Sequence, residues 1–473
     1  MTFTEQEKLE LQTAGVEPTL NKPITTKFLL TFTIPTIISF VLMAIFGMVD
    51  GVFASRGISI EALSAVNFVM PFMNVSMAIG SMLAMGGAAL VAKKKGKGLI
   101  SEARENFSLI AFVTFSLGLI ISVFGWLFRT EILELLGTDP FVFDLALAYI
   151  GPLILMSPLI MLGFVFTQFL IAEGKPVLGM ISTVSGSIVS TSLNALFIFG
   201  LELGIMSLAW ASAIGFSVPA VIGLFYFTLN RNGTIYFVRP KWDFKALSRS
   251  SMNGVSEMVT MLSGSVTTAV MNNVLVDLVG FEGVAAAGIV MGIQFIFVSL
   301  FLGYSTGVAP IVSYNYGKER SDKLVKLYKK SLIIVAVLSL IAIVFAVALA
   351  GLLAQIYVPA GTPVHVMTVR GVRLASIGFL LMGFNVFATN WFTAFNDGLV
   401  SGVMSFMRTM VFTVTLLVTL PRIWDLNGVW FALPMAEVLS IVLTVFFLIK
   451  MAKKYQYVQP KNAVLGTVAK SEG

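Results

Sequence analysis

The chain has 473 residues and a net charge of +7; 57% of its residues are hydrophobic and only 12% are charged. A soluble domain has about 25% charged residues, so this composition excludes a soluble globule and predicts a polytopic membrane protein. The chain has no cysteine, one histidine and no ATPase-type phosphate-binding glycine motif, which excludes disulfides, thiol nucleophiles and His/Cys metal clusters and argues against an ATP-driven motor.

Twelve apolar segments follow the polar residues 1–27. A helix needs about 20 apolar residues to cross the hydrocarbon core, and these segments are long enough. Residues 1–27 lack an apolar core followed by a cleavage site, so we expect no removable signal peptide. The expected spans are roughly 28–54, 62–91, 106–128, 141–172, 176–200, 205–229, 251–279, 284–313, 328–357, 366–394, 400–420 and 428–450.

Lysine and arginine are distributed unevenly between the two sides of these spans. The tails and every second loop hold 25 of the 31 basic residues, the opposite loops hold five, and Arg408 lies within a span. Basic residues of membrane proteins concentrate on the cytoplasmic side. We therefore expect a multi-pass protein of the inner or plasma membrane with both termini in the cytoplasm. The cytoplasmic loops account for the positive net charge, and we expect no nucleic-acid partner.

The chain resembles itself when it is shifted by 223 residues. Six of 24 positions match over 57–80 and five of 20 over 163–182, in one register. This repeat predicts an all-α fold of two six-helix bundles, related by a pseudo-twofold axis along the membrane normal. The expected boundaries are a cytoplasmic tail at 1–27, a bundle at 28–229, a cytoplasmic linker at 230–245, a bundle at 246–450 and a cytoplasmic tail at 451–473.

Three carboxylates fall within the expected spans: Asp50, Glu257 and Glu437. Ionisable side chains are costly inside a membrane and are therefore candidates for function. Asp50 lies roughly 33 Å along the first span, so a solvated residue near the outer headgroups is also a valid interpretation. Asn194 and Ser212 fall in the same outer half of the first bundle, so all three residues could share one cation-coupling pocket.

The second bundle has Asn273 at the position equivalent to Asp50, and asparagine cannot titrate. Ionic coupling in this bundle would therefore use Glu257 or Glu437. Glu437 lies closer to the middle of the membrane, where a functional and a structural carboxylate explain it equally well. Arg408, within the eleventh span, is a candidate partner for Glu437 or has no partner that the sequence identifies.

Two further features have a plain structural alternative. Glu257 lies only about six residues into its expected span, so an ion pair with cytosolic Lys245 or Arg249 explains it as well. Three methionines on one face of the second span, together with Asn273, are candidates for a flexible substrate cavity, although packing against lipid or helices explains the methionines too. These methionines are Met70, Met73 and Met77.

Several short motifs together resemble one known family. They are Pro35, Phe-Gly-Met-Val-Asp at 46–50, Glu-Ala-Leu-Ser-Ala-Val at 61–66, Glu-Gly-Lys-Pro at 173–176, Ser-Tyr-Asn-Tyr-Gly at 313–317 and Gly-Val-Trp at 428–430. With six plus six spans, they resemble the multidrug and toxic compound extrusion (MATE) family, nearest its DinF-like branch, over about 25–450. The resemblance implies an antiporter that expels organic, often cationic, compounds against inward protons or sodium, with Asp50 as the coupling carboxylate.

The sequence departs from the family pattern at two positions. Phe46 replaces a tyrosine four residues before the acid, and Ile198 replaces a second aspartate four residues after the asparagine. Both changes remove an oxygen ligand. Sodium needs several oxygens and a proton needs one carboxylate, so the changes favour proton coupling over the sodium alternative. We expect no cofactor and no metal site.

The sequence hypothesis is thus a monomeric antiporter, not an enzyme, that exports small cationic or amphipathic compounds by rocking of its two bundles in the bilayer. The alternative is a flippase for a lipid-linked sugar or lipid, from the same superfamily. Such flippases often have several basic residues facing the cavity, whereas this chain has only Arg408 within a span. An intramembrane enzyme would lack nucleophile and metal motifs, and a scaffold would not need Asp50 and Glu437.

Overall fold

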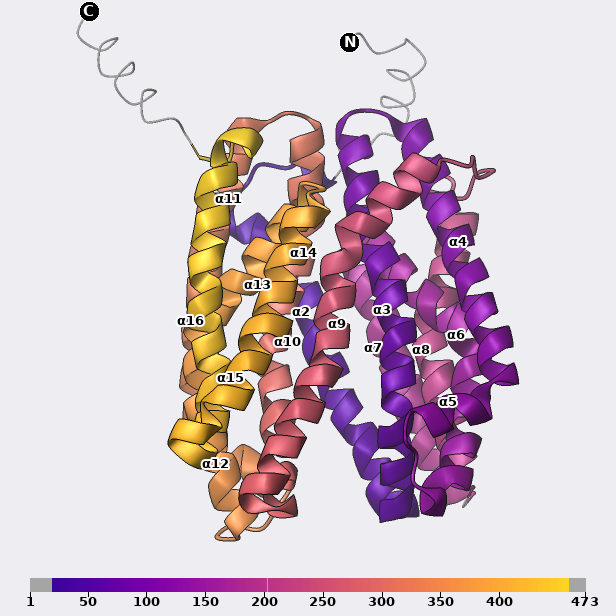
Figure 1. Cartoon of the computed structure of the whole chain (residues 1–473). Helices are drawn as coiled ribbons and strands as arrows, with labels where there is room; N and C mark the ends of the chain where they lie inside the picture. Colours follow the sequence, from indigo (N-terminus) through magenta and orange to yellow (C-terminus); the bar gives the residue numbers. More distant parts are fainter. Residues whose placement is uncertain (1–18, 202, 459–473) are drawn as a thin grey trace, which may run out of the picture.

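The computed structural model describes residues 19–201 and 203–458, which form helices and turns without any strand. In this part of the chain, twelve helices are long and apolar enough to cross a membrane. The predicted all-α fold with twelve spans is therefore confirmed. Figure 1 shows these helices side by side, with α2 beginning and α16 ending at the same end of the molecule.

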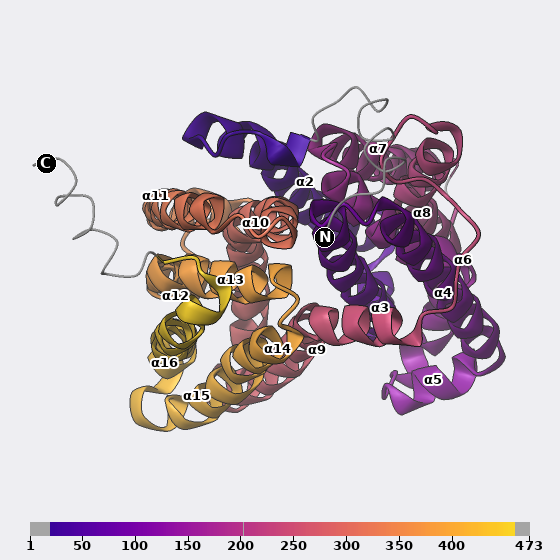
Figure 2. The ribbon, with the colours of Figure 1, turned by 90° about the horizontal axis from the view of Figure 1, so that it is seen from above.

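The helices gather into two groups, which Figure 2 shows from above. The first group contains α2 (Thr26–Val52), α3 (Ile60–Gly96), α4 (Ile100–Leu127), α5 (Arg129–Leu135), α6 (Phe143–Ala172), α7 (Pro176–Asn194) and α8 (Ile205–Leu229). The second contains α9 (Phe244–Val279), α10 (Phe281–Gly317), α11 (Ser321–Gln355), α12 (Pro363–Ala375), α13 (Phe379–Ala394), α14 (Gly398–Phe406), α15 (Thr413–Thr419) and α16 (Pro421–Tyr455).

Two expected spans are interrupted in their interior, and a third, 176–200, ends in the π-helix η4 (Ala195–Gly200). The expected span 366–394 is α12 and α13, joined by the 3₁₀ turn η5 (Ser376–Gly378). The expected span 400–420 is α14 and α15, joined by the π-helix η6 (Met407–Phe412). The tenth and eleventh spans therefore contain segments whose hydrogen-bond register differs from that of an α-helix.

Helix α2 contacts both groups. Near its beginning, Leu29 and Phe32 are buried in the apolar core of the second group, as is Leu20 of the preceding 3₁₀ turn η1 (Thr19–Asn21). Further along, it packs against α7 of the first group. Near its end, α2 contacts the second group again, where the Tyr357 hydroxyl donates a hydrogen bond to the Met48 sulfur at 2.9 Å. α2 therefore joins the core of one bundle to a site in the other.

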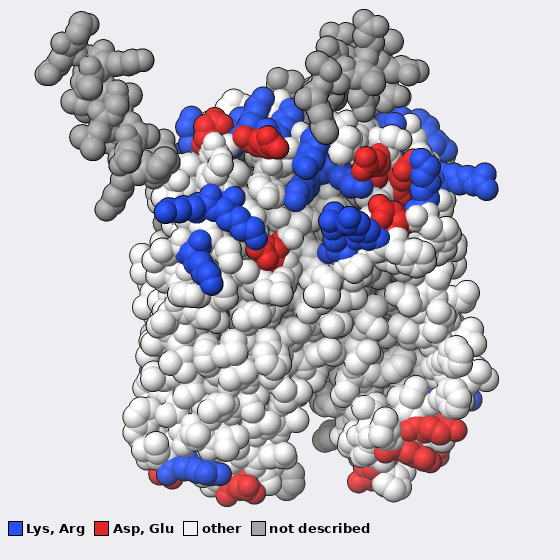
Figure 3. All heavy atoms as spheres, turned by 45° about the horizontal axis from the view of Figure 1, so that its top comes forward, with Lys and Arg blue, Asp and Glu red and all other residues white. Residues whose placement is uncertain are grey.

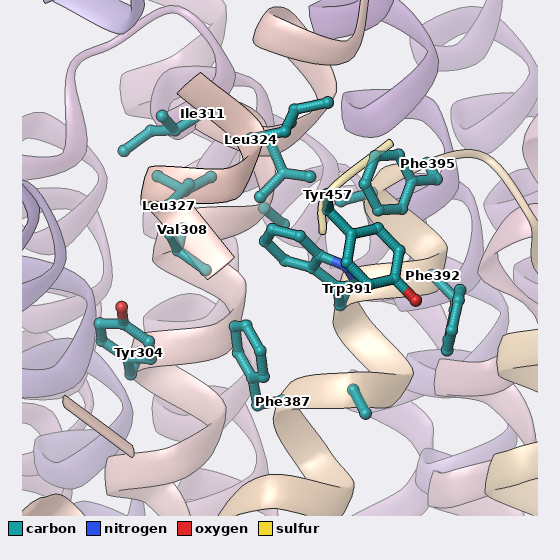
Figure 4. Close-up of a cluster of buried hydrophobic side chains, with 14 of the residues drawn as sticks. Tyr304, Val308, Ile311, Leu324, Leu327, Phe387, Trp391, Phe392, Phe395 and Tyr457 are labelled. Atoms are coloured by element: carbon teal, nitrogen blue, oxygen red, sulfur yellow. The ribbon is translucent and has the colours of Figure 1, made fainter. Parts of the chain in front are cut away.

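The core of the second bundle is aromatic near the end where α16 stops (Figure 4). Trp391 and Tyr457 are almost fully buried, and their ring centroids lie 5.7 Å apart. Phe395 stacks on Tyr455 at a centroid distance of 4.4 Å. Tyr457, two residues after the end of α16, is therefore packed into the bundle.

The two bundles touch backbone to backbone where α3 meets α9. A Cβ atom at Gly86 would lie 1.9 Å from the Ser250 carbonyl oxygen, and one at Gly254 would lie 1.9 Å from the Met82 carbonyl oxygen. Helix α3 meets α10 as closely at Gly96, where a Cβ atom would lie 2.1 Å from a carbonyl oxygen of α10. Only glycine permits these approaches, so the bundles are sealed together in this half of the molecule.

Charged side chains gather at that same end, which we call the basic end, and an uncharged belt lies below it (Figure 3). At the opposite end the surface is notched between the two bundles. An uncharged belt is what a lipid-facing surface requires. The sealed basic end and the notched opposite end together describe a cleft that opens away from the basic end.

Candidate functional site

Asp50 and Asn194 meet in the first bundle, far from the basic end. Asp50 lies in the last turn of α2, and Asn194 is the last residue of α7. The Asn194 Nδ2 atom donates a hydrogen bond to the Asp50 Oδ1 atom at 3.0 Å. Asn194 is fully buried and its own Oδ1 atom has no hydrogen-bond partner in the described part of the chain. The carboxylate is therefore held by a protein amide.

Both polar and apolar side chains surround Asp50. Ser212, in the second turn of α8, is buried, but no hydrogen bond joins it to Asp50 in the described structure. Tyr149 of α6 is also buried and lies within electrostatic reach of Asp50. Ile198 packs into the apolar core of this bundle. Asp50 itself is half-buried, and no basic side chain pairs with it among the described residues. Its negative charge is therefore uncompensated, which favours a group that can be neutralised.

Three π-helices lie among the described residues, and each adjoins a candidate polar side chain. η2 (Phe53–Ile58) begins three residues after Asp50. η4 (Ala195–Gly200) begins directly after Asn194, and η6 contains Arg408. π-Helical segments are rare and are frequent at functional sites. The π-helices therefore lie at the same two sites, one in each bundle, as the candidate polar residues.

The second bundle holds Glu437 in a polar cluster. Glu437, on α16, has 6% of its surface exposed. The Asn385 Nδ2 atom of α13 donates to the Glu437 Oε2 atom at 2.6 Å and to its backbone carbonyl oxygen at 3.1 Å. The Thr444 hydroxyl donates to the Asn385 Oδ1 atom at 2.7 Å. The orientation of this carboxylate is fixed by two polar neighbours that carry no charge.

Arg408 pairs with Glu437, one of the two candidate carboxylates within the spans of this bundle. Its NH1 atom lies 3.4 Å from the Glu437 Oε1 atom, and its positive charge also acts on Glu257. The alternative ion pair between Glu257 and Lys245 or Arg249 is absent from the described structure. Helix α9 begins at Phe244, so Glu257 lies deeper in its helix than the sequence indicated.

The substrate-cavity candidates do not share one environment. Met73 is buried in the core of the first bundle, Met77 is partly buried against it, and Met70 is 44% exposed. Asn273 is exposed on α9. Beside Met73, the Asn74 Nδ2 atom donates a hydrogen bond to the Ser265 hydroxyl of the other bundle at 3.0 Å. Asn74 therefore links the two bundles, whereas Met73 packs in the apolar core of the first bundle.

Sequence reasoning missed Tyr149, Asn385, Thr444 and Asn74. Each is an uncharged polar residue inside an apolar span, where a single uncharged side chain gives a weaker signal than an ionisable one. A search for asparagines within spans would have found Asn74 and Asn385. No three His, Cys, Asp or Glu side chains gather into a metal-binding group among the described residues.

A sequence model described as MatE matches the chain twice, at residues 35–196 and 257–419. The second match begins 222 residues after the first and ends 223 residues after it. This spacing agrees with the internal repeat found in the sequence. The two matched segments contain Asp50 and Asn194 in the first bundle and Glu257 and Arg408 in the second.

Known proteins resemble the chain over nearly its whole length. Multidrug export protein MepA of Staphylococcus haemolyticus (strain JCSC1435) is 26% identical over 428 residues, covering 89% of this chain and 92% of the relative. MepA of Staphylococcus aureus (strain MRSA252) is 24% identical over 432 residues, covering 89% and 94%. A crystal structure of MATE in the straight conformation has a TM-score of 0.87 at 20% identity, covering 93% and 99%. An outward-facing multidrug resistance MATE family transporter of the MOP superfamily has a TM-score of 0.86 at 18% identity, covering 97% and 100%.

Proposed function

The chain belongs to the MatE family of transporters, and we propose that it is a secondary active antiporter that exports organic, drug-like compounds in exchange for protons. The relatives named as multidrug export proteins support export of small organic molecules. The cleft between the bundles supports a substrate path through the middle of the molecule. We propose that a monomer in the plasma membrane does this, with the basic end in the cytoplasm.

The single observation that carries the coupling proposal is the hydrogen bond between Asn194 and Asp50. A neutral carboxyl and an amide can pair through two hydrogen bonds, in which each group donates once. When Asp50 takes up a proton, it can donate to the Asn194 Oδ1 atom, which otherwise lacks a partner. Proton binding would thus satisfy the amide and remove a poorly compensated charge.

Sodium is the alternative coupling ion, and the site favours it less. Hard cations prefer several oxygen ligands. Phe46 and Ile198 supply none, and Ile198 is buried in the apolar core. Among the described residues, Asp50 is therefore the one carboxylate at this site, and the other oxygens at hand are the Asn194 carbonyl and the hydroxyls of Tyr149 and Ser212, which suits a proton better.

The flippase alternative would use free basic side chains to hold a pyrophosphate. Arg408 is the basic residue in the middle of the spans, and it is paired with Glu437. A positive charge that is already engaged by a carboxylate is a poor anion receptor. This pairing favours the export of cationic compounds over the flipping of an anionic lipid.

The test is Asp50→Asn in proteoliposomes with an imposed pH gradient. The substitution keeps the size of the side chain and removes its titration, and a neutral amide is cheaper to bury than a charge. We expect proton-driven efflux of an organic cation to fall at least about a hundredfold, as for loss of an essential proton carrier. Folded protein should remain at the wild-type level.

A control variant and a second measurement, with a sodium gradient, complete this experiment. Asp144→Asn, at an exposed carboxylate in the first turn of α6, is the control and should export normally. Efflux that an imposed sodium gradient drives in the wild type would contradict proton coupling. Full pH-driven efflux in Asp50→Asn would move the coupling site away from Asp50.

A further inference from the structure

Four basic side chains gather at the basic end of the seam between the bundles. They are Lys93 and Lys97 at the end of α3, Arg249 of α9 and Lys454 of α16. Among the described residues, the last three are the charged groups that act on Lys93, and all of them repel its ammonium. Two of the four belong to the first bundle and two to the second. The sealed arrangement therefore brings like charges of the two bundles together.

Three of these cations have no carboxylate partner. The Lys454 Nζ atom lies 3.0 Å from the Asp397 Oδ2 atom. Lys93, Lys97 and Arg249 form no ion pair among the described residues. Like charges held close together raise the energy of an arrangement, and less so where water screens them. The chain itself thus leaves three positive charges of the cluster uncompensated.

Lys93 and Arg249 are held by the same contacts that seal the bundles. A Cβ atom at Gly317 of α10 would lie 2.1 Å from the Lys93 carbonyl oxygen. The Lys93 Nζ atom lies over the Tyr316 ring of α10, 4.6 Å from its centroid. Arg249 directly precedes Ser250, whose carbonyl oxygen touches the α3 backbone. The closed seam therefore fixes the two cations, and opening of the seam would separate them.

An exposed side of α9 beside this cluster suits the level of lipid headgroups. It combines apolar and basic residues at positions that fall on one side of a helix. The exposed residues of its first nine positions are Phe244, Lys245, Ser248, Arg249 and Met252. Just before the helix, Trp242 is 64% exposed and stacks on Phe244 at a centroid distance of 5.8 Å. Exposed aromatic rings beside basic residues are typical of a membrane–water interface.

We propose that the headgroup of an anionic phospholipid binds Lys93, Lys97 and Arg249 at this end of the seam and stabilises the sealed arrangement of the bundles. The phosphate oxygens accept charge-assisted hydrogen bonds from both bundles and offset the repulsion between them. The acyl chains cover the exposed Phe244 and Met252. Anionic lipids are present in the cytoplasmic leaflet, where they attract nearby lysines and arginines.

The lipid composition of the membrane then controls how readily the cleft opens toward the basic end. This inference goes beyond the proposed export, and it rests on the proposed location of the basic end in the cytoplasm. It does not depend on the coupling ion or on the exported compound.

The experiment measures binding of phosphatidylglycerol to the purified full-length protein in a neutral detergent, by native mass spectrometry across a range of lipid concentrations. Phosphatidylcholine is the neutral lipid for comparison, and it should bind more weakly. We expect Arg249→Gln to weaken phosphatidylglycerol binding by about fivefold, equivalent to about 1 kcal/mol, and to leave phosphatidylcholine binding unchanged. Lys97→Gln, at an exposed residue after α3, should have a similar effect and decides if Arg249→Gln does not fold.

Two variants serve as controls. Arg249→Lys keeps the positive charge and should bind phosphatidylglycerol like the wild type. Lys329→Gln removes an exposed lysine of α11, outside the cluster, and should also bind like the wild type. An equal loss in Lys329→Gln would mean that the lipid follows only the overall charge, and would overturn the site.

A second measurement tests whether the lipid seals the bundles. Spin labels on Ser101→Cys of α4 and Leu399→Cys of α14 report the separation of the bundles at the basic end, because both residues are exposed and the chain has no native cysteine. We expect the labels to move to shorter separations when phosphatidylglycerol replaces phosphatidylcholine in the vesicles. The same exchange of lipids should leave the separations unchanged when Arg249→Gln is added.

The proposal is overturned by equal binding of the two lipids, by unchanged phosphatidylglycerol binding in folded Arg249→Gln and Lys97→Gln, or by label separations that ignore the lipid. Displacement of the lipid by inorganic phosphate would also overturn it, since the site would then be a receptor for free phosphate. A protein that binds phosphatidylglycerol as expected, but exports nothing under a pH gradient, would sink the antiport proposal and leave this site standing.

Discussion

Asp50 and Glu437 each accept a hydrogen bond from an asparagine of a neighbouring helix, at 3.0 Å and 2.6 Å. An amide orients a carboxylate without neutralising it, so both groups can still gain a proton or a cation. Glu173 is different. It accepts from Lys95 at 2.7 Å and from the backbone and hydroxyl of Thr234 at 2.6 Å and 2.8 Å. Lys95 and Thr234 thus compensate the negative charge of Glu173 in full. We call these three residues the clamp and infer that its role is structural.

We expect Glu173→Gln to destabilise the protein by about 3 kcal/mol, because breaking a buried ion pair leaves an uncompensated charge. The side chains of Lys95 and Glu173 are only 2% and 3% exposed, so water cannot replace the lost partner. The clamp also holds Thr234, which follows α8. A thermal unfolding midpoint in detergent, compared with the wild type, measures the effect.

The matched control is Glu105→Gln, which breaks a pair of similar length with Lys241 at 2.8 Å. Lys241 is 76% exposed, and exposed pairs contribute little to stability. Its unfolding midpoint should stay close to that of the wild type. Equal midpoints for Glu173→Gln and Glu105→Gln would contradict the clamp.

At the scale of single residues, the sequence predicted some partners and missed others. Depth along the helices placed Asp50 beside Asn194, because hydropathy shows where each helix enters the membrane. Depth along the helices did not pair Asn385 with Glu437, because their hydrogen bond depends on how α13 and α16 are rotated about their own axes. Lys95 was counted in a cytoplasmic loop, whereas α3 continues to Gly96 and buries it.

At the scale of elements, the twelve spans were predictable and their internal breaks were not. Apolar length identifies a span whatever its hydrogen-bond register. A π-helix changes that register without changing composition, so η2, η4 and η6 leave no signal in hydropathy. The glycine contacts between α3 and α9 were also missed, because a glycine in a span has many possible roles.

We expect Gly86→Ala to reduce export at least about tenfold, because its Cβ atom would lie 1.9 Å from the Ser250 carbonyl oxygen and 2.8 Å from the Gly254 nitrogen. The bundles could not then close at the basic end. Alanine favours the helix itself by about 1 kcal/mol over glycine, so α3 should still form. Efflux from proteoliposomes measures the loss.

Gly264→Ala is the control for this substitution. It lies on α9, and no atom lies within 4 Å of where its Cβ atom would be. It should export at the wild-type rate or faster. Normal export by Gly86→Ala would mean that the two bundles do not need this close approach.

At the scale of the whole molecule, the unequal ends of Figure 3 support the predicted orientation. A cysteine at exposed Lys97, after α3, should resist an impermeant thiol reagent in intact cells. A cysteine at Leu135, which is 88% exposed at the end of α5, should react. The chain has no native cysteine, so each label reports one position. Labelling at Lys97 together with protection at Leu135 would invert the orientation.

The two bundles must separate along their seam if the cleft is to open toward the basic end. Asn74 of α3 and Ser265 of α9 form a hydrogen bond across this seam at 3.0 Å. A disulfide in the variant with Asn74→Cys and Ser265→Cys should therefore hold the bundles in the arrangement of Figure 1. We expect oxidation to stop export and reduction to restore it.

Each single-cysteine variant under the same oxidation is the control for this experiment. Such a chain cannot form the internal bridge, so its export should not respond to the oxidant. The extent of cross-linking is read from the mass of a proteolysed sample, and efflux is measured in the same vesicles. Undiminished export from a fully bridged sample would show that α3 and α9 stay together through the cycle. Movement would then have to occur along the contact of α2 with α10, where the beginning of α2 is buried in the second bundle.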